Sequence, residues 1–320
     1  MQGTAKVGPD LETIRAAHRR IAPHIHRTPM MTSASLDEKA GARLYFKCEN
    51  LQKTGSFKIR GATNAIFSLS AEEAARGVVT HSSGNHAAAV ALAARRRGIW
   101  AWIVMPSNAP EAKRKAVEAY GGEITFCEPT LAAREAATAE IIRKTGAVLI
   151  HPFDDDRIIA GQATATVEFL EEVPDLDFIL APVSGGGLLS GTAIAAKSLR
   201  PAIRVVGCEP KNADDAYRSL AEGRLVPMEH PDTIADGLRA SLAGHTLAIL
   251  RQHVERIVLV SEEEIVAAMR QVWERMKLVI EPSAAVAVAP ALGRRLDTEG
   301  KKVGIILSGG NLDLTRLPFA

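Results

Sequence analysis

Cysteine is scarce in this sequence. Cys48, Cys127 and Cys208 are odd in number and far apart, and no Cys-x-x-Cys pair occurs among them. A disulfide framework needs paired cysteines and a zinc site needs closely spaced ones, so the pattern fits neither. We expect three reduced thiols in a cytoplasmic protein.

The sequence has almost no excess of positive over negative charge, and aromatic residues are also scarce. Lys and Arg number 39 against 37 Asp and Glu, and the only candidate for a basic surface is the short run Arg95–Arg97. Nucleic-acid binding needs a concentrated basic surface. Aromatic residues at 4% also leave few side chains on which bases stack. We therefore expect no nucleic-acid partner.

Long apolar runs are missing too. No stretch approaches the roughly 18 apolar residues of a transmembrane helix, and residues 1–10 lack the apolar core of a signal peptide. We therefore expect no membrane partner. With 47% hydrophobic residues, the chain is nevertheless too apolar to be disordered. A length of 320 residues predicts two domains or one large α/β domain.

Short β-branched runs alternate with helical stretches along the chain. In a first series, strands are expected at 78–80, 100–105, 123–126 and 148–150, and helices at 85–97, 111–120 and 131–144. After a break at 151–156, strands are expected at 178–183, 204–209, 256–260 and 303–307, while the N-terminal third adds a helix at 11–24 and a strand at 44–48. Runs of these lengths are typical of βαβ units in parallel sheets. We predict a large domain from 1–75 and 151–320, with a small domain, 76–150, inserted in it.

A glycine-rich loop, Ser184-Gly-Gly-Gly-Leu188, follows the predicted strand 178–183. Bare amides at the N-terminus of a helix predict a phosphate site. The loop lacks the Gly-Lys-[Ser/Thr] of a Walker loop. Glu209, at the end of the next predicted strand, leaves a dinucleotide site as one alternative. A plain tight turn is another.

Lys58 lies between Phe57 and Ile59 at the expected start of a helix. Apolar neighbours desolvate the ammonium group and favour the neutral amine that forms a Schiff base. An exposed lysine on a basic turn is the alternative. Together, the lysine and the glycine loop supply the amine and the phosphate anchor that pyridoxal phosphate requires.

Two further loops carry polar clusters. His81-Ser-Ser-Gly-Asn-His86 precedes an alanine-rich helix, and the free amides of that helix can hold a carboxylate. Helix capping by the serines alone is the alternative. Ser308-Gly-Gly-Asn311 follows the last predicted strand.

These loops, with Lys53-Thr-Gly-Ser-Phe-Lys-Ile-Arg-Gly61, resemble the motifs of fold-type-II pyridoxal-phosphate enzymes. Within that class, the chain resembles the branch of serine racemases and serine/threonine dehydratases, which includes the 3-hydroxyaspartate dehydratases. Further matching segments are 159–162, 209–215, 233–237 and 273–277. The resemblance implies an α/β fold of two open twisted sheets with flanking helices, like that of the tryptophan synthase β-subunit. It also implies a homodimer.

The cofactor that the resemblance implies is pyridoxal phosphate. Its expected binding residues are Phe57, Lys58, Asn85, Gly185, Gly186, Gly187, Leu188 and Ser308. Lys58 forms the Schiff base, Phe57 packs beside the ring, Asn85 bonds the ring hydroxyl, and the amides of the glycine loop hold the phosphate. Ser308 meets the pyridine nitrogen and cannot hold it protonated as an aspartate would, which makes the ring a weaker electron sink. Elimination and racemisation tolerate that better than transamination does.

The resemblance also implies the reaction. Lys58 and Ser83 address the substrate Cα from opposite faces as acid/base groups, and the α-carboxylate is held by Ser82, Ser83, Asn85 and His86. Loss of the Cα proton, the β-hydroxyl and ammonia makes this an ammonia-lyase, or dehydratase, of a small β-hydroxy amino acid. A serine/threonine dehydratase or a serine/aspartate racemase stays open within the same class. An NAD-dependent oxidoreductase and a non-catalytic amino-acid-binding protein are alternatives from other classes.

The substrate that we favour is 3-hydroxyaspartate, whose second carboxylate must be paired with a cation when it is buried. Arg239 stands where relatives commonly have lysine, and a guanidinium can grip a carboxylate with two parallel bonds. It is our candidate for that cation, with His81 and Arg134 as reserves.

A divalent cation is a second expected ligand. By the resemblance, it is held by Glu209, Asp215 and the carbonyl of Ala213. Oxygen ligands suit Mg²⁺, Mn²⁺ or Ca²⁺ rather than zinc. Taken without the resemblance, Asp214-Asp215 is more typical of a solvated helix start.

Overall fold

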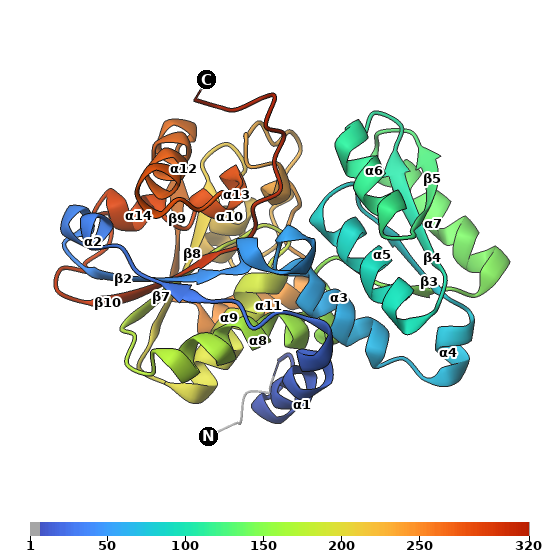
Figure 1. Cartoon of the computed structure of the whole chain (residues 1–320), viewed down its shortest axis with the longest axis horizontal. Coiled ribbons are helices and arrows are strands. Elements are labelled where there is room, and N and C mark those ends of the chain that lie inside the picture. Colours follow the sequence, from blue (N-terminus) through green and yellow to red (C-terminus); the bar gives the residue numbers. More distant parts are fainter. Residues whose placement is uncertain (1–6, 320) are drawn as a thin grey trace.

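The computed structural model describes residues 7–319, so residues 1–6 of the predicted large domain and Ala320 lie outside it. Figure 1 shows two lobes, each built on its own sheet. The larger sheet has the strand order β1-β2-β10-β7-β8-β9, and the smaller sheet has the order β5-β4-β3-β6. The strands are β1 (Met30–Met31), β2 (Arg43–Cys48), β3 (Val78–His81), β4 (Ala101–Pro106), β5 (Glu123–Cys127), β6 (Val148–Leu149), β7 (Phe178–Pro182), β8 (Arg204–Pro210), β9 (Arg256–Val260) and β10 (Lys302–Leu307).

Among these strands, only β1 and β2 pair antiparallel; the other pairs are parallel. The α/β fold with two sheets is therefore confirmed. The last strand, β10, lies between β2 and β7, so segments from both halves of the sequence meet in the larger sheet. The carboxyl ends of β10, β7 and β8 share one edge, which is where ligands bind in such sheets.

Helices cover both faces of the larger sheet. Phe178 and Leu180 of β7 join the core shared with α2, α12, α13 and α14, whereas Ile179 and Ala181 join the core shared with α8, α9 and α11. This alternation follows from the two-residue period of a strand. The helices are α1 (Leu11–Ile21), α2 (Ala34–Ala40), α3 (Lys58–Phe67), α4 (Ala71–Ala75), α5 (Asn85–Arg97), α6 (Glu111–Ala119), α7 (Leu131–Thr145), α8 (Asp156–Glu172), α9 (Gly187–Leu199), α10 (Asp215–Glu222), α11 (Gly244–His253), α12 (Glu262–Met276), α13 (Pro282–Ala285) and α14 (Ala289–Leu292).

Helix α8 packs against both α3 and α9, and glycines allow the close approach. A Cβ on Gly161 of α8 would lie 2.6 Å from the Cα of Gly61 in α3. A Cβ on Gly191 of α9 would lie 2.6 Å from the carbonyl oxygen of Ile159 in α8. Helix α3 also contacts α5 of the smaller lobe, and Figure 1 shows it between the two lobes. Contacts with α8 thus set the positions of the first turns of both α3 and α9.

Most predicted elements agree with the structure to within one or two residues at their ends. The predicted helix 85–97 coincides with α5, and the predicted strand 256–260 coincides with β9. The helix predicted at 11–24 is shorter, because α1 ends at Ile21 and a 3-10 turn, Ala22–His24, follows. Pro23 lies in that turn and has no N–H to continue an α-helix.

The basic run Arg95–Arg97 ends α5 and binds the main chain. Arg97 donates through Nη1 to the carbonyl of Ile66, at the end of α3, and through Nη2 to the carbonyl of Leu69 at 2.5 Å. Arg95 donates to the carbonyl of Ala119 at 3.1 Å. The run therefore joins α5 to its neighbours.

Within residues 7–319, none of the helices combines the length and the apolar composition needed to cross a membrane. The strands between 78 and 149 form the smaller sheet and the others form the larger one. The domain boundaries at 75/76 and 150/151 stay a prediction.

Candidate active site

The lysine motif and the last strand meet at one edge of the larger sheet. Lys58 is the first residue of α3. Just before it, Ser56 forms an isolated β-bridge with Gly309, and the Phe57 N–H donates to the carbonyl of Ser308 at 3.0 Å. These contacts bring together two of the four loops that the sequence singles out.

The side chain of Lys58 is partly buried. Its Nζ donates to the carbonyl oxygen of Pro152 at 2.9 Å and lies 5.2 Å from the centre of the Phe57 ring. Burial lowers the pKa of Lys58 to about 8, and the charge of Glu281 opposes that shift. A lysine with this pKa supplies more neutral amine near pH 7 than an exposed lysine does. The amine expected from the sequence is therefore suited to act as a nucleophile or base.

The glycine loop offers free amides at the start of α9. Ser190 makes the first helical bond, donating to the carbonyl of Gly186 at 2.8 Å. The N–H groups of residues 185–189 donate to no acceptor within residues 7–319. Gly186 has a φ of 92°, a left-handed conformation that glycine adopts without strain. A phosphate would satisfy such a row of donors.

A segment that the sequence analysis took as a break links the amine to the glycine loop. Pro152 accepts the bond from Lys58, and the next residue, Phe153, lies against the loop. A Cβ on Gly185 would lie 2.3 Å from Cδ1 of the Phe153 ring. A side chain at this position would force the ring or the loop to shift. The lysine amine and the phosphate-type loop therefore flank the same short segment.

Ser184, the first residue of the glycine loop, is bonded through its side chain to the segment around Ala240. Its Oγ donates to the carbonyl of Ala240 at 2.9 Å and accepts from the N–H of Ala240 at 3.0 Å. These two bonds anchor the loop to the segment that carries Arg239.

Asn85, the first residue of α5, reaches across to the larger lobe. Its Nδ2 donates to Oε1 of Glu281 at 2.9 Å, and its Oδ1 accepts from Nδ2 of Asn311 at 2.8 Å. These contacts fix which end of the amide is the donor. The same Nδ2 also donates to Oε2 of Glu281 at 3.2 Å, so the amide faces both carboxylate oxygens.

Glu281 is a site residue that the sequence analysis missed. Its side chain is buried beside Asn85, and a Cβ on Gly309 would lie 2.5 Å from its Oε1. Burial, and then the charge of Asp236, raise the pKa of Glu281 to about 8. An acidic residue directly after the apolar run Leu278–Ile280 was the available signal, because such a residue is seldom buried without a partner.

The small-lobe loop 81–86 lies at the same junction. Ser82 and Ser83 are partly exposed, and Ser82 Oγ accepts from the N–H of Gly84 at 3.3 Å. His86 is buried, and its Nε2 lies 3.1 Å from the carbonyl oxygen of Ile150. Burial holds the pKa of His86 well below its usual value. A neutral ring that donates through Nε2 leaves Nδ1 as an acceptor, so His86 would have to reorient to donate to a carboxylate.

The three candidates for a second carboxylate occupy different surroundings. Arg239 is exposed, and its Nε and Nη2 donate to the carbonyl of Thr233 at 3.2 and 2.5 Å. His81 ends β3, with its ring 6.2 Å from that of His151. Burial, and then the charge of Arg134 in α7, lower the pKa of His81. Of the other two candidates, Arg134 is the one whose charge is felt at the His81 ring.

Two buried carboxylates lie where the cation is expected. Glu209 accepts from the N–H groups of Ala216 and Tyr217 at 2.9 and 2.8 Å, and Asp215 accepts from the N–H of Leu242 at 2.9 Å. Burial, and then the charge of Asp215, raise the pKa of Glu209 well above its usual value. Burial raises the pKa of Asp215 to about 6.

The surroundings of these carboxylates suit a cation. Within residues 7–319, neither Glu209 nor Asp215 forms a salt bridge, and Ala213 is buried in the same loop. A hard divalent ion would offset the repulsion of the two charges. The described residues contain no cluster of three side-chain ligands, so the Ala213 carbonyl would have to complete the set.

Comparison with known proteins decides the family. The model of the family "Pyridoxal-phosphate dependent enzyme" matches residues 21–309. The chain is 50% identical over 313 residues to a serine racemase of Dictyostelium discoideum, covering 96% of each chain. It is 48% identical to the beta-hydroxyaspartate dehydratase of Paracoccus denitrificans, covering 97% of this chain and 99% of the relative. The solved structure of maize serine racemase superposes with a TM-score of 0.95 at 48% identity, over 96% of this chain and 95% of that chain.

The chain belongs to the pyridoxal-phosphate-dependent enzymes. Its resemblance to the racemase and dehydratase branch is confirmed, and an NAD site at the glycine loop is no longer needed to explain that loop. The residues present also fit the cofactor. They supply an amine with a lowered pKa, free amides for a phosphate and an oriented asparagine. Ser308 is buried at the end of β10. The individual roles of these residues stay predictions.

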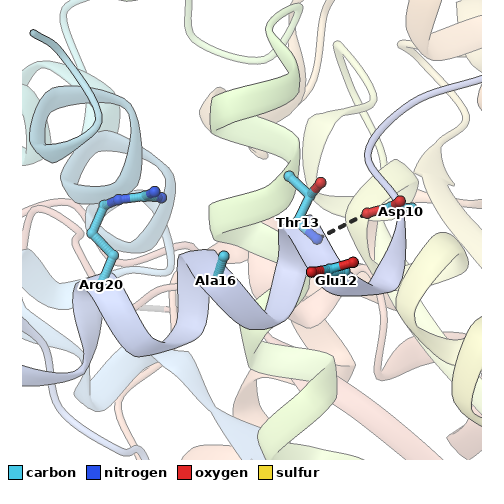
Figure 2. A pocket seen from close by; sticks show the side chains of 5 residues that line it. All are labelled: Asp10, Glu12, Thr13, Ala16 and Arg20. Atoms are coloured by element: carbon cyan, nitrogen blue, oxygen red, sulfur yellow. Dashed lines mark hydrogen bonds between the residues drawn. The ribbon is translucent and has the colours of Figure 1, made fainter.

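A depression on α1 is separate from this site. Figure 2 shows it lined by Asp10, Glu12, Thr13, Ala16 and Arg20. The Thr13 N–H donates to Asp10 at 2.8 Å, and the Arg20 guanidinium donates to Asn64 at 2.6 Å. Its main polar groups thus have protein partners, and it offers no comparable chemistry.

Proposed function

We propose that this pyridoxal-phosphate-dependent enzyme is an ammonia-lyase that dehydrates a small β-hydroxy amino acid, with 3-hydroxyaspartate as its substrate. The observation that carries the proposal is the partly buried Lys58, whose amine flanks the same segment as the glycine loop. The similarity to a beta-hydroxyaspartate dehydratase supports the choice of substrate. The test is to incubate the purified protein with 3-hydroxyaspartate, serine and threonine and to measure 2-oxo acid and ammonia.

In the proposed reaction, Lys58 of this chain carries out the first proton transfer. Pyridoxal phosphate, when bound, withdraws electrons from the substrate Cα and makes its hydrogen acidic. Lys58, with its lowered pKa, takes the Cα proton as a general base. The β-hydroxyl then leaves as water after it gains a proton. Hydrolysis of the resulting enamine gives the 2-oxo acid and ammonia.

A serine racemase is the second candidate, because several similar relatives are serine racemases. In that reaction, Ser83 would return a proton to the face opposite Lys58. Chiral chromatography of L-serine incubations separates the two candidates. Formation of D-serine faster than pyruvate would favour the racemase.

Arg239 is the first candidate to bind the second carboxylate of the substrate. We expect wild-type enzyme to turn over 3-hydroxyaspartate with higher kcat/KM than serine or threonine. Arg239→Ala should then cost the diacid more than serine, by about 1–3 kcal/mol, because a charged hydrogen bond is lost only with the diacid. Measured kcat/KM for both substrates checks this.

Arg134→Ala is the matched comparison for Arg239→Ala. If only Arg134→Ala lowers kcat/KM selectively for the diacid, the second carboxylate is bound by Arg134 of α7 and by His81 instead of Arg239. Equal losses for both substrates in both variants, or a wild-type preference for threonine, would indicate that the substrate is serine or threonine and not the diacid.

We propose further that Glu209, Asp215 and the Ala213 carbonyl bind Mg²⁺, Mn²⁺ or Ca²⁺. The support is the pair of buried carboxylates with raised pKa values. Chelator should lower the melting temperature and activity, and Mg²⁺ or Mn²⁺ should restore both, since an ion that binds only the folded state stabilises it.

The effect of the ion on stability should depend on pH in a fixed direction. A carboxyl whose pKa is raised on folding binds protons more tightly in the folded state, so its contribution to stability falls as pH rises. For Asp215 this loss spans roughly pH 4 to its folded pKa of about 6. The stabilisation by Mg²⁺ should therefore be larger at pH 7 than at pH 5. Chelator-treated protein that melts identically with and without Mg²⁺ at both pH values would contradict the site.

A further inference from the structure

Four charged side chains form a buried cluster behind Lys58, which we call the Arg60 cluster. Arg60 donates through Nε to Oε2 of Glu49 at 2.7 Å and through Nη1 and Nη2 to the two oxygens of Glu168 at 2.8 Å each. Lys47 donates to Oε2 of Glu168, also at 2.8 Å. All four side chains are almost completely buried. Two positive and two negative charges balance within the core.

Such a cluster is a costly way to hold a core together. Each buried charge loses its hydration, and apolar side chains of similar volume often stabilise a core at least as well. A planar guanidinium bonded to two carboxylates does, however, have a fixed direction. Arg60 is two residues after Lys58 on α3, and its partner Glu168 is on α8. The cluster therefore fixes the rotation of α3 against α8.

The first turn of α3 has a second fixed contact with α8. Phe57, the residue before α3, gives the helix no side-chain cap. Instead, Oε1 of Gln162 in α8 accepts from the N–H of Gly61 at 3.1 Å. Gly161, next to Gln162, touches the backbone of Gly61. Segment 159–162 matches the family motif noted in the sequence, and two of its residues, Gly161 and Gln162, contact α3 next to Lys58.

We propose that Arg60 and Gln162 are positioning residues for Lys58: together they hold α3 so that the Lys58 amine stays bonded to Pro152, beside the residue that contacts the glycine loop. The proposal rests on the function proposed above, in which Lys58 is the reactive amine. Because burial is the main cause of the lowered pKa of Lys58, rotation of α3 should expose the amine and raise that pKa.

Arg60→Lys and Gln162→Met test the proposal. The first keeps the charge but loses the fork, and the second keeps the volume but loses the acceptor for Gly61. We expect each to lower kcat by about 10- to 100-fold with KM near wild type, because a displacement of about 1 Å at a reacting group has this effect. We also expect a shift in the pH profile of cofactor uptake. When pyridoxal phosphate is added to cofactor-free full-length protein, the variants should regain the yellow absorbance band at the wild-type rate only at a higher pH.

Phe169→Leu is the matched control. Phe169 is a buried residue of α8 that belongs to the core with β7 and α9, apart from the α3 side. It should lower the melting temperature without moving kcat or the pH profile of cofactor uptake. If Arg60→Lys does not fold, Gln162→Met decides by itself.

The outcomes separate the proposal from the function on which it rests. Variants that match Phe169→Leu in kcat and in the pH profile would overturn the positioning role and leave Lys58 as the reactive amine. Borohydride labelling of the protein that survives in Lys58→Ala would overturn the proposed function itself, whatever Arg60→Lys does.

Discussion

Lys58→Ala should abolish turnover and remove the yellow absorbance band that borohydride bleaches. The amine that this change removes is the one bonded to Pro152, with a pKa lowered to about 8. Loss of both a covalent attachment point and a general base should lower kcat by at least about 10³-fold. The fold should persist, because the glycine-loop amides remain and still bind the cofactor phosphate non-covalently. Turnover, absorbance and circular dichroism together check the prediction.

Lys53→Ala is the control for Lys58→Ala. Lys53 belongs to the same motif but is partly exposed in the 3-10 turn before it. Its removal should leave the bleachable band in place. A band that persists in Lys58→Ala and disappears in Lys53→Ala would show that Lys53, and not Lys58, carries the reactive amine.

Gly185→Ala should weaken cofactor binding by about 10- to 100-fold. The new Cβ would lie 2.3 Å from the Phe153 ring, so either the ring or the loop must move. Overpacking of this kind costs about 1–3 kcal/mol, and 1.4 kcal/mol corresponds to a factor of ten in affinity. Titration of cofactor-free protein with pyridoxal phosphate, followed by absorbance, gives the dissociation constant.

The control is Gly244→Ala, at the first position of α11, where a Cβ would meet no atom within 4 Å. It should bind the cofactor like the wild type. Equal affinities for Gly185→Ala and Gly244→Ala would mean that the glycine loop does not hold the phosphate.

Sequence patterns predicted the helices and strands well, because these elements depend on residues that are close together in the sequence. Helix α5 begins after Gly84 and ends before Gly98, which has a φ of 72°, and both boundaries follow from glycine placement. The positions of Lys58 and of the glycine loop at helix starts were also predictable. So was their meeting beyond the carboxyl ends of parallel strands.

Contacts between distant segments were not predictable in this way. Glu281 meets Asn85 across 196 residues of sequence, and no periodicity encodes that pairing. Phe153 lies in the segment taken as a break between two series of strands. The Arg60 cluster likewise joins β2, α3 and α8, although Lys47 in an otherwise apolar strand was a signal of a buried partner. The homodimer and the cytoplasmic location stay predictions.

The most direct test of the central claim is borohydride reduction of the wild-type enzyme as purified, followed by mass mapping of its peptides. Reduction converts the carbon–nitrogen double bond between cofactor and lysine into a stable single bond. Our account predicts a pyridoxyl-phosphate adduct on the peptide that contains Lys58. An adduct on another lysine, or none on a protein that binds the cofactor, would contradict it.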